Sequence, residues 1–310
     1  MNDETVSVVI PTYFRNERLR EAIESVRAQT YEPIEIIVVD GSEEAHARPV
    51  AENYDVRYIP QDEDRGPHAG RSEGAQVAEG AYVNFLDDDD RFHPRKIEKQ
   101  RSVLDANDEV GVVYCGIEWE NGHPVLPDPD VRGDVLDRAL MFDMTPSSPS
   151  TMLIDADVLD AILPFENLHG ADDMGMKIEL AQRCAFDFVD EPLVTKGDDG
   201  DGLGGSRENI EGRFTLVDRY RDLYDRHPPH VRRTAVGHTH LLDAELTLNR
   251  TVWSPRAIRQ AALACYHVPG LPLSFAGYLV ASVFGRPGRD VARGVYSALV
   301  LGDEHRGKIT

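Results

Sequence analysis

The chain has 310 residues and a formal net charge of −22, from 33 basic and 55 acidic residues. This length predicts one large domain or two, with enough residues to bury a substantial core. So acidic a surface argues against non-specific nucleic-acid binding, and it is typical of proteins that stay soluble at very high salt, which indicates a halophilic source.

The cysteines and the N-terminus bear on the compartment. Cys115, Cys184 and Cys265 are isolated and odd in number, so we expect neither a disulfide framework nor a zinc site. The first residues, Met1 to Glu4, lack the basic and apolar regions of a signal peptide. We therefore expect a cytoplasmic protein.

Short apolar runs alternate with helix-like segments in the first third of the chain. The expected strands are 6–10, 34–39, 56–59 and 81–86, and the expected helices between them are 16–28, 43–53 and 66–79. In the first helix Leu19, Ala22, Ile23 and Val26 share one face, and Asn16 is the expected N-cap. This alternation predicts βαβ units and an α/β fold with a mostly parallel central sheet.

Polar residues stand where three of these strands end. Pro11, Thr12 and Tyr13 follow the first strand, Asp40 ends the second, and the run Asp87–Asp90 follows the strand at 81–86. Ligands bind at the carboxyl edge of parallel sheets, so we expect these groups to converge there. Four adjacent carboxylates repel one another, and Mg²⁺ or Mn²⁺ would offset that repulsion. The alternative is a solvated acidic turn, which the convergence of three strand ends disfavours.

The second half of the chain is more mixed. Further expected elements are a helix from Pro94 to about residue 107, a strand at 111–119, a hairpin turn at Asn121–Gly122 and a strand at 151–154. Gly170–Asp173 opens another helix, with two Asp residues in its first turn. They are candidates for a functional role, and the alternative is that they only stabilise the helix dipole. Lys196–Gly205 is rich in Gly and Asp and predicts a mobile loop, for which a lid is one interpretation. Helices are expected over most of 208–251.

The C-terminal tail differs from the rest in charge. From Thr251 to Gly302 there are five Arg residues and one acid, a net charge of +4, so the remainder carries −26. The uncharged run between Arg259 and Arg286 is broken by Pro269, Gly270 and Pro272, and each half is shorter than the roughly 20 residues that a membrane span requires. Two short interfacial membrane helices are the favoured interpretation, and the alternatives are a helix pair packed on its own domain and a true span.

The motifs occur in an order that resembles a known family. They are VSVVIPTY at 6–13, EIIVVDGS at 35–42, the segment 66–80, FLDDDD with a following Pro at 85–94, and GADD at 170–173. Together they resemble family-2 glycosyltransferases with the GT-A fold, over roughly residues 5–200. The resemblance implies a GT-A domain at 1–205, with a nucleotide-binding half at 1–110 and an acceptor half at 111–205. A helical region at 206–310 would follow, with membrane-interface helices at 255–302.

The resemblance also implies roles for residues that would bind the donor. Asp40 matches the carboxylate that accepts a hydrogen bond from the base, and Pro11, Thr12 and Tyr13 match the strand edge that packs on it. Arg71 matches an arginine near the diphosphate.

The acidic run and the GADD motif complete the implied site. Asp87, with Asp88 beside it, matches the position that faces the donor ribose, and Asp89 matches the last Asp of the family's metal-binding DxD. Asp173 matches the catalytic base. A further metal ligand is not evident, although Asp198 or Asp199 could serve.

The function that this resemblance implies is an inverting glycosyltransferase that requires Mg²⁺ or Mn²⁺. The donor would be a nucleotide sugar, most simply UDP-linked, and the acceptor a lipid-linked molecule or a glycan at the cytoplasmic face of the membrane, in surface or protein glycan assembly. One alternative is a non-catalytic sugar-nucleotide-binding protein. Another is a sugar nucleotidyltransferase, although Pro11–Phe14 is not the Gly-rich basic loop that such enzymes use.

Overall fold

One nine-stranded sheet organises the computed structural model, within the residues that it describes: 2–168, 170–197, 206–268 and 273–291. The strand order is β3-β2-β1-β4-β8-β6-β9-β5, and β7 pairs with β6. The strands are β1 Asn2–Thr12, β2 Ile34–Asp40, β3 Arg57–Pro60, β4 Gly80–Phe85, β5 Arg91–Phe92, β6 Val110–Trp119, β7 Pro124–Val125, β8 Leu153–Asp155 and β9 Ala185–Lys196. Strands β1 to β4, β6 and β9 run in one direction and β5, β7 and β8 in the other. The predicted α/β class with a mostly parallel sheet is confirmed.

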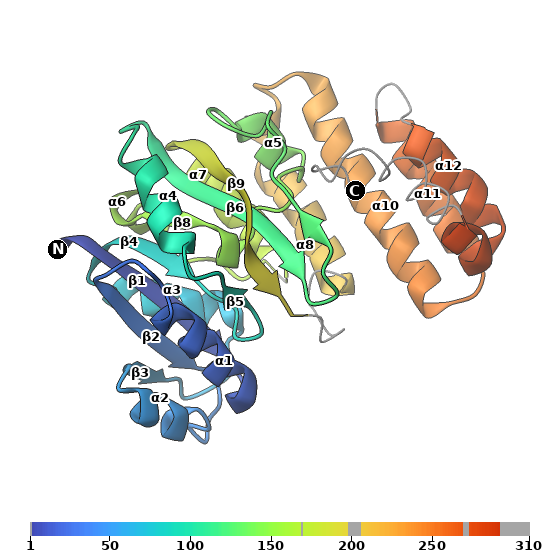
Figure 1. Ribbon diagram of the computed structural model, residues 1–310. Coiled ribbons are helices and arrows are strands. Elements are labelled where there is room, and N and C mark those ends of the chain that lie inside the picture. The colour runs from blue at the N-terminus through green and yellow to red at the C-terminus, as the bar shows by residue number, and fades with distance from the viewer. Residues whose placement is uncertain (1, 169, 198–205, 269–272, 292–310) are drawn as a thin grey trace.

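Helices cover both faces of this sheet (Figure 1). Successive side chains of a strand point to opposite faces, so Val8 and Val9 of β1 join different cores. The core around Val8 includes α1 Asn16–Arg27, α2 Arg48–Tyr54 and α4 Lys96–Leu104. The core around Val9 includes α3 Pro67–Val77, α5 Leu136–Leu140, α6 Ala156–Asp160 and α7 Asp172–Ala181. The predicted apolar face of the first helix is confirmed, because its four residues are all buried in α1.

Two glycines let α3 approach the sheet closely. A Cβ atom on Gly74 would lie 2.2 Å from Val9 Cγ1, and one on Gly70 would lie 3.1 Å from Pro11 Cβ. A larger residue at position 74 would therefore push α3 away from β1. Because Gly70 packs against the end of β1, the neighbouring Arg71 is held at the carboxyl edge of the sheet.

The C-terminal helices extend away from the sheet. They are α8 Arg207–Arg219, α9 Arg221–Tyr224, α10 Pro229–Arg250, α11 Pro255–His267 and α12 Leu273–Val283. Val231 and Ala235 of α10 belong to the main core, and α11 and α12 lie beyond α10, on its far side from the sheet (Figure 1). The buried Ala257, Ala261 and Ala264 form the packed side of α11. Within the described ranges, no helix has both the length and the apolar character needed to cross a bilayer.

Some local predictions need correction. The N-cap of α1 is Arg15 rather than Asn16, whose side-chain amide instead donates to the His46 carbonyl at 3.0 Å. Helix α2 begins at Arg48, later than predicted, because the backbone after Asp40 forms a turn around that carboxylate. The hairpin turn is confirmed: Gly122 has φ +82° and the turn joins β6 to β7. Most of the predicted mobile loop, at 198–205, lies outside the described residues.

Candidate active site

The three polar strand ends meet at one edge of the sheet, as the sequence predicts. Thr12 of β1 is the register partner of Asp40 of β2, and Val9 of β1 is the partner of Phe85 of β4. After β4 the backbone stays beside β1, because Leu86 N–H donates to the Val9 carbonyl at 2.9 Å. The acidic run that follows therefore begins beside the ends of the two neighbouring strands.

Asp87 is held by two cations from distant segments. The Arg71 guanidinium donates to Asp87 Oδ1 at 2.5 Å, and Lys196 Nζ, at the end of β9, donates to Oδ2 at 3.4 Å. Burial alone would raise the pKa of Asp87, but Arg71 and Lys196 outweigh it and hold that pKa well below its usual range. Asp87 therefore stays ionised, with Arg71 fixed against it.

Asp88 and Asp89 share a third cation. Arg15 Nη1 lies 3.3 Å from an oxygen of Asp88 and 3.1 Å from an oxygen of Asp89. The Thr12 hydroxyl also donates to Asp88 at 2.8 Å. Burial raises the pKa of Asp88 to about 6, although Thr12 and Arg15 oppose the shift. Asp89 is more open, with 24% of its side chain exposed.

Asp90 is buried and contacts two segments that are far apart in the sequence. It accepts hydrogen bonds of 2.5 Å from both the Ser150 hydroxyl and Lys196 Nζ. Arg15, Arg71 and Lys196 thus offset the repulsion among the four carboxylates. The sequence alone predicts a divalent ion in that role. The neutralisation of the acidic run does not by itself require a metal.

Sequence reasoning missed two residues that contact the acidic run, Arg15 and Lys196. Arg15 stands three residues after the end of β1, and its closeness to that polar strand end was a usable signal. Lys196 reaches the site because β9 pairs with β5, with Thr195 opposite Arg91. Strand β5 has only two residues, so no sequence pattern reveals this pairing.

Asp40 is fully buried and already surrounded by donors. Oδ1 accepts from the Ser42 N–H at 2.9 Å and the Ser42 hydroxyl at 2.7 Å. Oδ2 accepts from the Ala47 N–H and the Tyr58 hydroxyl, both at 2.8 Å. A carboxylate offers about four acceptor positions, so a nucleotide base can bond to Asp40 only by replacing one of these donors.

An exposed aromatic surface lies beside this turn. Tyr13 and Phe14 are 50% and 45% exposed, and their rings meet edge to face at 4.8 Å. Phe14 has φ +55° and its ring lies 5.0 Å from that of His46. A bulky residue with positive φ is uncommon and marks a constrained backbone position. Here that position is just after the end of β1, at the carboxyl edge of the sheet.

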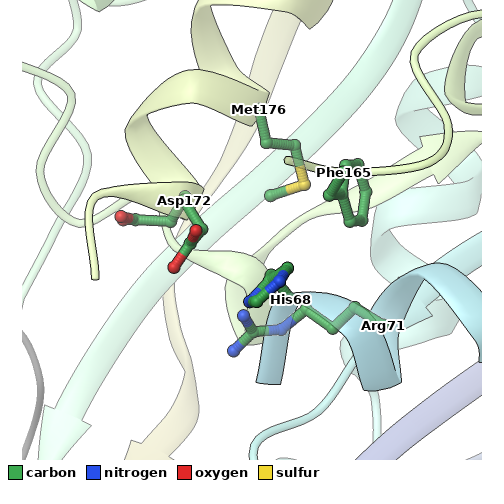
Figure 2. Close-up of a pocket in the computed structure, with 6 residues that line it drawn as sticks. His68, Arg71, Phe165, Asp172 and Met176 are labelled. Atoms are coloured by element: carbon green, nitrogen blue, oxygen red, sulfur yellow. The ribbon is translucent and has the colours of Figure 1, made fainter. Parts of the chain in front are cut away.

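A second cluster of charged residues, Asp172 and Asp173 at the start of α7, lines a small pocket opposite α3. The pocket is lined by His68, Arg71, Phe165, Asp172, Asp173 and Met176. Figure 2 shows His68 and Arg71 of α3 facing Asp172 of α7, with Met176 and Phe165 on the other wall. Arg71 therefore joins the two parts of the site: it binds Asp87 and also lines the pocket next to Asp173.

The two aspartates of α7 have different surroundings. Asp172 accepts hydrogen bonds from the backbone N–H groups of Leu168 at 2.6 Å and Gly170 at 3.2 Å, so its carboxylate holds the preceding turn. Asp173 is 30% exposed at its side chain, and its Oδ2 lies 3.3 Å from Lys177 Nζ. Both aspartates are partly exposed, and the difference between them is that backbone N–H groups already occupy the carboxylate of Asp172.

The residues present fit a metal that a substrate helps to bind. Nowhere in the described part of the chain are three His, Cys, Asp or Glu side chains arranged to hold a metal ion. Mg²⁺ often uses only one or two carboxylates when phosphates complete its shell, and the partly exposed Asp89 can supply one. The further candidates Asp198 and Asp199 lie outside the described residues.

We expect Asp40→Ala to destabilise the fold by about 2–4 kcal/mol, because it leaves four donors, three of them buried, without an acceptor. Tyr58→Phe removes only one of those donors and should cost about 1 kcal/mol. Urea unfolding of both variants checks this. An Asp40→Ala protein as stable as the wild type would show that Asp40 does not hold the turn between β2 and α2.

The sequence comparisons identify relatives over the part of the chain that contains this site. Residues 7–163 match the model of glycosyl transferase family 2. An uncharacterised glycosyltransferase of Rickettsia typhi is 38% identical over 116 residues, which cover 36% of each chain. A glucosyl-dolichyl phosphate glucuronosyltransferase of Haloferax volcanii is 39% identical over 130 residues, which cover 40% of this chain and 39% of that protein. The match spans well under half the length of these curated relatives.

Solved structures of low sequence identity share the fold over almost the whole chain. Residues 1–349 of S. aureus TarS superpose with a TM-score of 0.64 at 16% identity, covering 94% of this chain and 92% of that one. The mannosyltransferase PcManGT from Pyrobaculum calidifontis, solved with GDP-Man and Mn²⁺, gives 0.59 at 18% identity, covering 96% and 88%. The family model covers just over half of the chain, including the acidic run and Arg71. The chain therefore belongs to glycosyl transferase family 2.

Proposed function

We propose that this glycosyltransferase transfers a sugar from a UDP-linked donor to a lipid-linked or glycan acceptor, with inversion and with a divalent metal. The observation that carries the proposal is the position of Arg71. It contacts Asp87 at the sheet edge and lines the pocket that contains Asp173. A diphosphate bound at the sheet edge and an acceptor bound in the pocket would therefore lie next to each other, with Arg71 between them.

The donor side is assigned to the sheet edge. Tyr13 and Phe14 offer an exposed aromatic surface for a base, and Asp40 holds the turn beneath it, so that a base contact with Asp40 requires the Tyr58 hydroxyl to move. Asp87 and Asp88 lie where the ribose would follow. Crystals of S. aureus TarS contain UDP and UDP-GlcNAc, and those of PcManGT contain GDP-Man, which supports a nucleotide-sugar donor.

The diphosphate needs positive charge, because cleavage of the sugar–phosphate bond leaves a strongly anionic group. Arg71 supplies one cation, and Arg15 and Lys196 are already present around the acidic run. A divalent ion bound through Asp89 would add Lewis-acid stabilisation of the leaving group. The Mn²⁺ in the PcManGT structure supports this assignment and leaves the choice between Mg²⁺ and Mn²⁺ open.

Asp173 is assigned as the general base. It would accept the proton of an acceptor hydroxyl as that oxygen attacks the sugar carbon. Asp172 is occupied by two backbone N–H groups and does not offer a second free carboxylate. Among the described residues this assignment has one base on the far face of the sugar and no second nucleophile beside it, which supports a single displacement with inversion of configuration.

We expect Asp89→Asn to remove the metal dependence of UDP binding. In the wild type, EDTA should weaken UDP binding by about tenfold or more, because the metal links Asp89 to the diphosphate. In the variant, UDP should bind weakly with or without Mn²⁺. Calorimetric titration measures both, with Asp105→Asn, an exposed residue after α4, as the matched control. UDP binding that is equally strong in Asp89→Asn and equally sensitive to EDTA would exclude Asp89 as the ligand.

We also assign a membrane-docking role to an apolar tip, formed by Val252 and Trp253 before α11 and by Val283 and Phe284 at the end of α12. All four side chains are about half exposed or more. The two segments are joined, because Trp253 Nε1 donates to the Val283 carbonyl at 2.9 Å and Arg286 N–H donates to the Val252 carbonyl at 2.7 Å. The tip is thus a defined surface rather than scattered residues.

The charge around the tip favours an anionic bilayer. The segment from Thr251 to Gly302 carries +4 in a chain of −22, and the tip lies beside Arg286. Exposed Trp and Phe next to Arg are typical of membrane-surface segments. The name of the Haloferax volcanii relative, a glucosyl-dolichyl phosphate glucuronosyltransferase, further supports a lipid-linked acceptor. We place that acceptor at the cytoplasmic face, in surface or protein glycan assembly.

We expect Trp253→Ala with Phe284→Ala to reduce binding to phosphatidylglycerol vesicles by about tenfold or more, because two large apolar side chains no longer insert. Tyr266→Ala is the control. It removes an exposed aromatic residue from the other end of α11, roughly 20 Å along a 13-residue helix. Vesicle sedimentation at low and at molar salt measures the effect. Equal loss in both variants, or no wild-type binding at either salt, would remove the tip from the proposal.

A further inference from the structure

Arg213 is a partly buried arginine of α8 that forms no ion pair within the described part of the chain. Its Nε donates to Asn209 Oδ1 at 2.9 Å, and its guanidinium carbon lies 5.5 Å from the centre of the Phe142 ring. Both partners are uncharged. Burial lowers the pKa of Arg213 to about 10, which expresses the cost of keeping this charge away from water without a paired carboxylate.

A close approach between the backbones of α8 and the start of α7 brings Arg213 toward the cluster of Asp172 and Asp173. A Cβ atom on Gly212 would lie 2.0 Å from the Leu168 carbonyl oxygen, so only glycine allows α8 to approach the start of α7 this closely. The Asn209 side chain also donates to the Gly170 carbonyl, in the turn that opens α7. These contacts hold α8 against the turn that opens α7. Asp173 lies in the first turn of α7, and its charge partly opposes the effect of burial on the pKa of Arg213.

Asp173 also contacts a second cation, which in turn contacts a residue with an unpaired hydroxyl. Lys177 Nζ is 3.3 Å from Asp173 Oδ2 and 3.0 Å from the Ser147 carbonyl oxygen. The Ser147 hydroxyl is buried and has no hydrogen-bond partner. The charge of one carboxylate thus acts on two cations, and the hydroxyl of Ser147 is left unsatisfied. An arrangement with surplus donors and surplus positive charge is complementary to an anion.

We propose that Arg213, together with Lys177 and Ser147, binds a phosphate group of the acceptor beside Asp173. The free guanidinium nitrogens, the ammonium group and the hydroxyl are all donors, and a phosphate monoester offers three acceptor oxygens. The donor diphosphate is assigned elsewhere, to Arg71 and the acidic run. The assignment of this phosphate to the acceptor rests on the proposed function. The existence of an anion-binding site at Arg213 does not.

Binding of farnesyl monophosphate, farnesol, inorganic phosphate and UDP with Mn²⁺ tests this site. Wild-type protein should bind farnesyl monophosphate at least about tenfold more tightly than farnesol, since only the phosphate makes charge-assisted hydrogen bonds. Arg213→Gln should lose about tenfold or more of that affinity, and Arg213→Lys should recover only part of it. UDP binding should be unchanged in both. Arg219→Gln is the matched control, because Arg219 is on the same helix but pairs with Glu166 at the surface.

The remaining comparisons decide which statement fails. Inorganic phosphate bound as tightly as farnesyl monophosphate would mean a free-phosphate site and would overturn the acceptor assignment. So would equal loss of UDP affinity in Arg213→Gln, because that places Arg213 at the donor. A farnesyl monophosphate affinity unchanged in Arg213→Gln overturns the site itself. If the phosphate binds through Arg213 but UDP never binds, the anion site stands and the proposed function fails.

A structural role for Arg213 makes a different prediction. An unpaired buried charge costs stability, so Arg213→Gln should unfold at the same denaturant concentration as the wild type or a higher one. A clear drop, with both ligands lost together, would show that Arg213 only supports the packing of α8 on α7.

Discussion

Four consecutive carboxylates at the end of β4 must be neutralised, and the way in which the chain does this determines the arrangement of the site. The cations come from three places far apart in the sequence: Arg15 after β1, Arg71 on α3 and Lys196 at the end of β9. Each ion pair is buried or partly buried, where charges interact more strongly than at the surface. The acidic run therefore links β1, α3 and the end of β9, in addition to any role with a substrate.

This arrangement also explains how a diphosphate could bind. The same cations that neutralise the carboxylates are the natural partners of phosphate oxygens, so a donor and a metal together would exchange partners within an existing set of charges. Asp89 is the most suitable carboxylate for that exchange. It is more exposed than Asp88 or Asp90, and its partner Arg15, at 39%, is more exposed than Arg71 and Lys196, which hold Asp87. Asp87 and Asp90 are held more tightly and serve to position Arg71 and Lys196.

The sequence predicted most of what is local or periodic. The burial of Val6 to Ile10, the apolar face of α1 and the meeting of Thr12, Asp40 and the acidic run at one edge follow from strand and helix periodicity and from the rule for parallel sheets. The capping role of Asn16 was wrong because a tertiary contact with His46 takes its side chain.

What the sequence could not show is which distant groups complete the site. Lys196 is brought in by a two-residue strand pairing, and Arg213 by a glycine whose importance depends on the neighbouring helix. Asp40 matched a base-binding position, yet whether its oxygens are free depends on Tyr58 and Ala47, which no local pattern connects to it. Side-chain contacts between separate elements decide these roles.

The most direct measurement is nucleotide release from a panel of nucleotide sugars, with membranes as the acceptor source, with and without EDTA, in the wild type and in Asp173→Asn. The account predicts metal-dependent release of UDP from one donor by the wild type. It predicts that Asp173→Asn binds UDP normally but releases little from that donor, because only the base is lost. Equal turnover by both proteins would contradict the assignment of Asp173. Wild-type binding of UDP without turnover of any donor would contradict the transferase mechanism and favour a sugar-nucleotide-binding role.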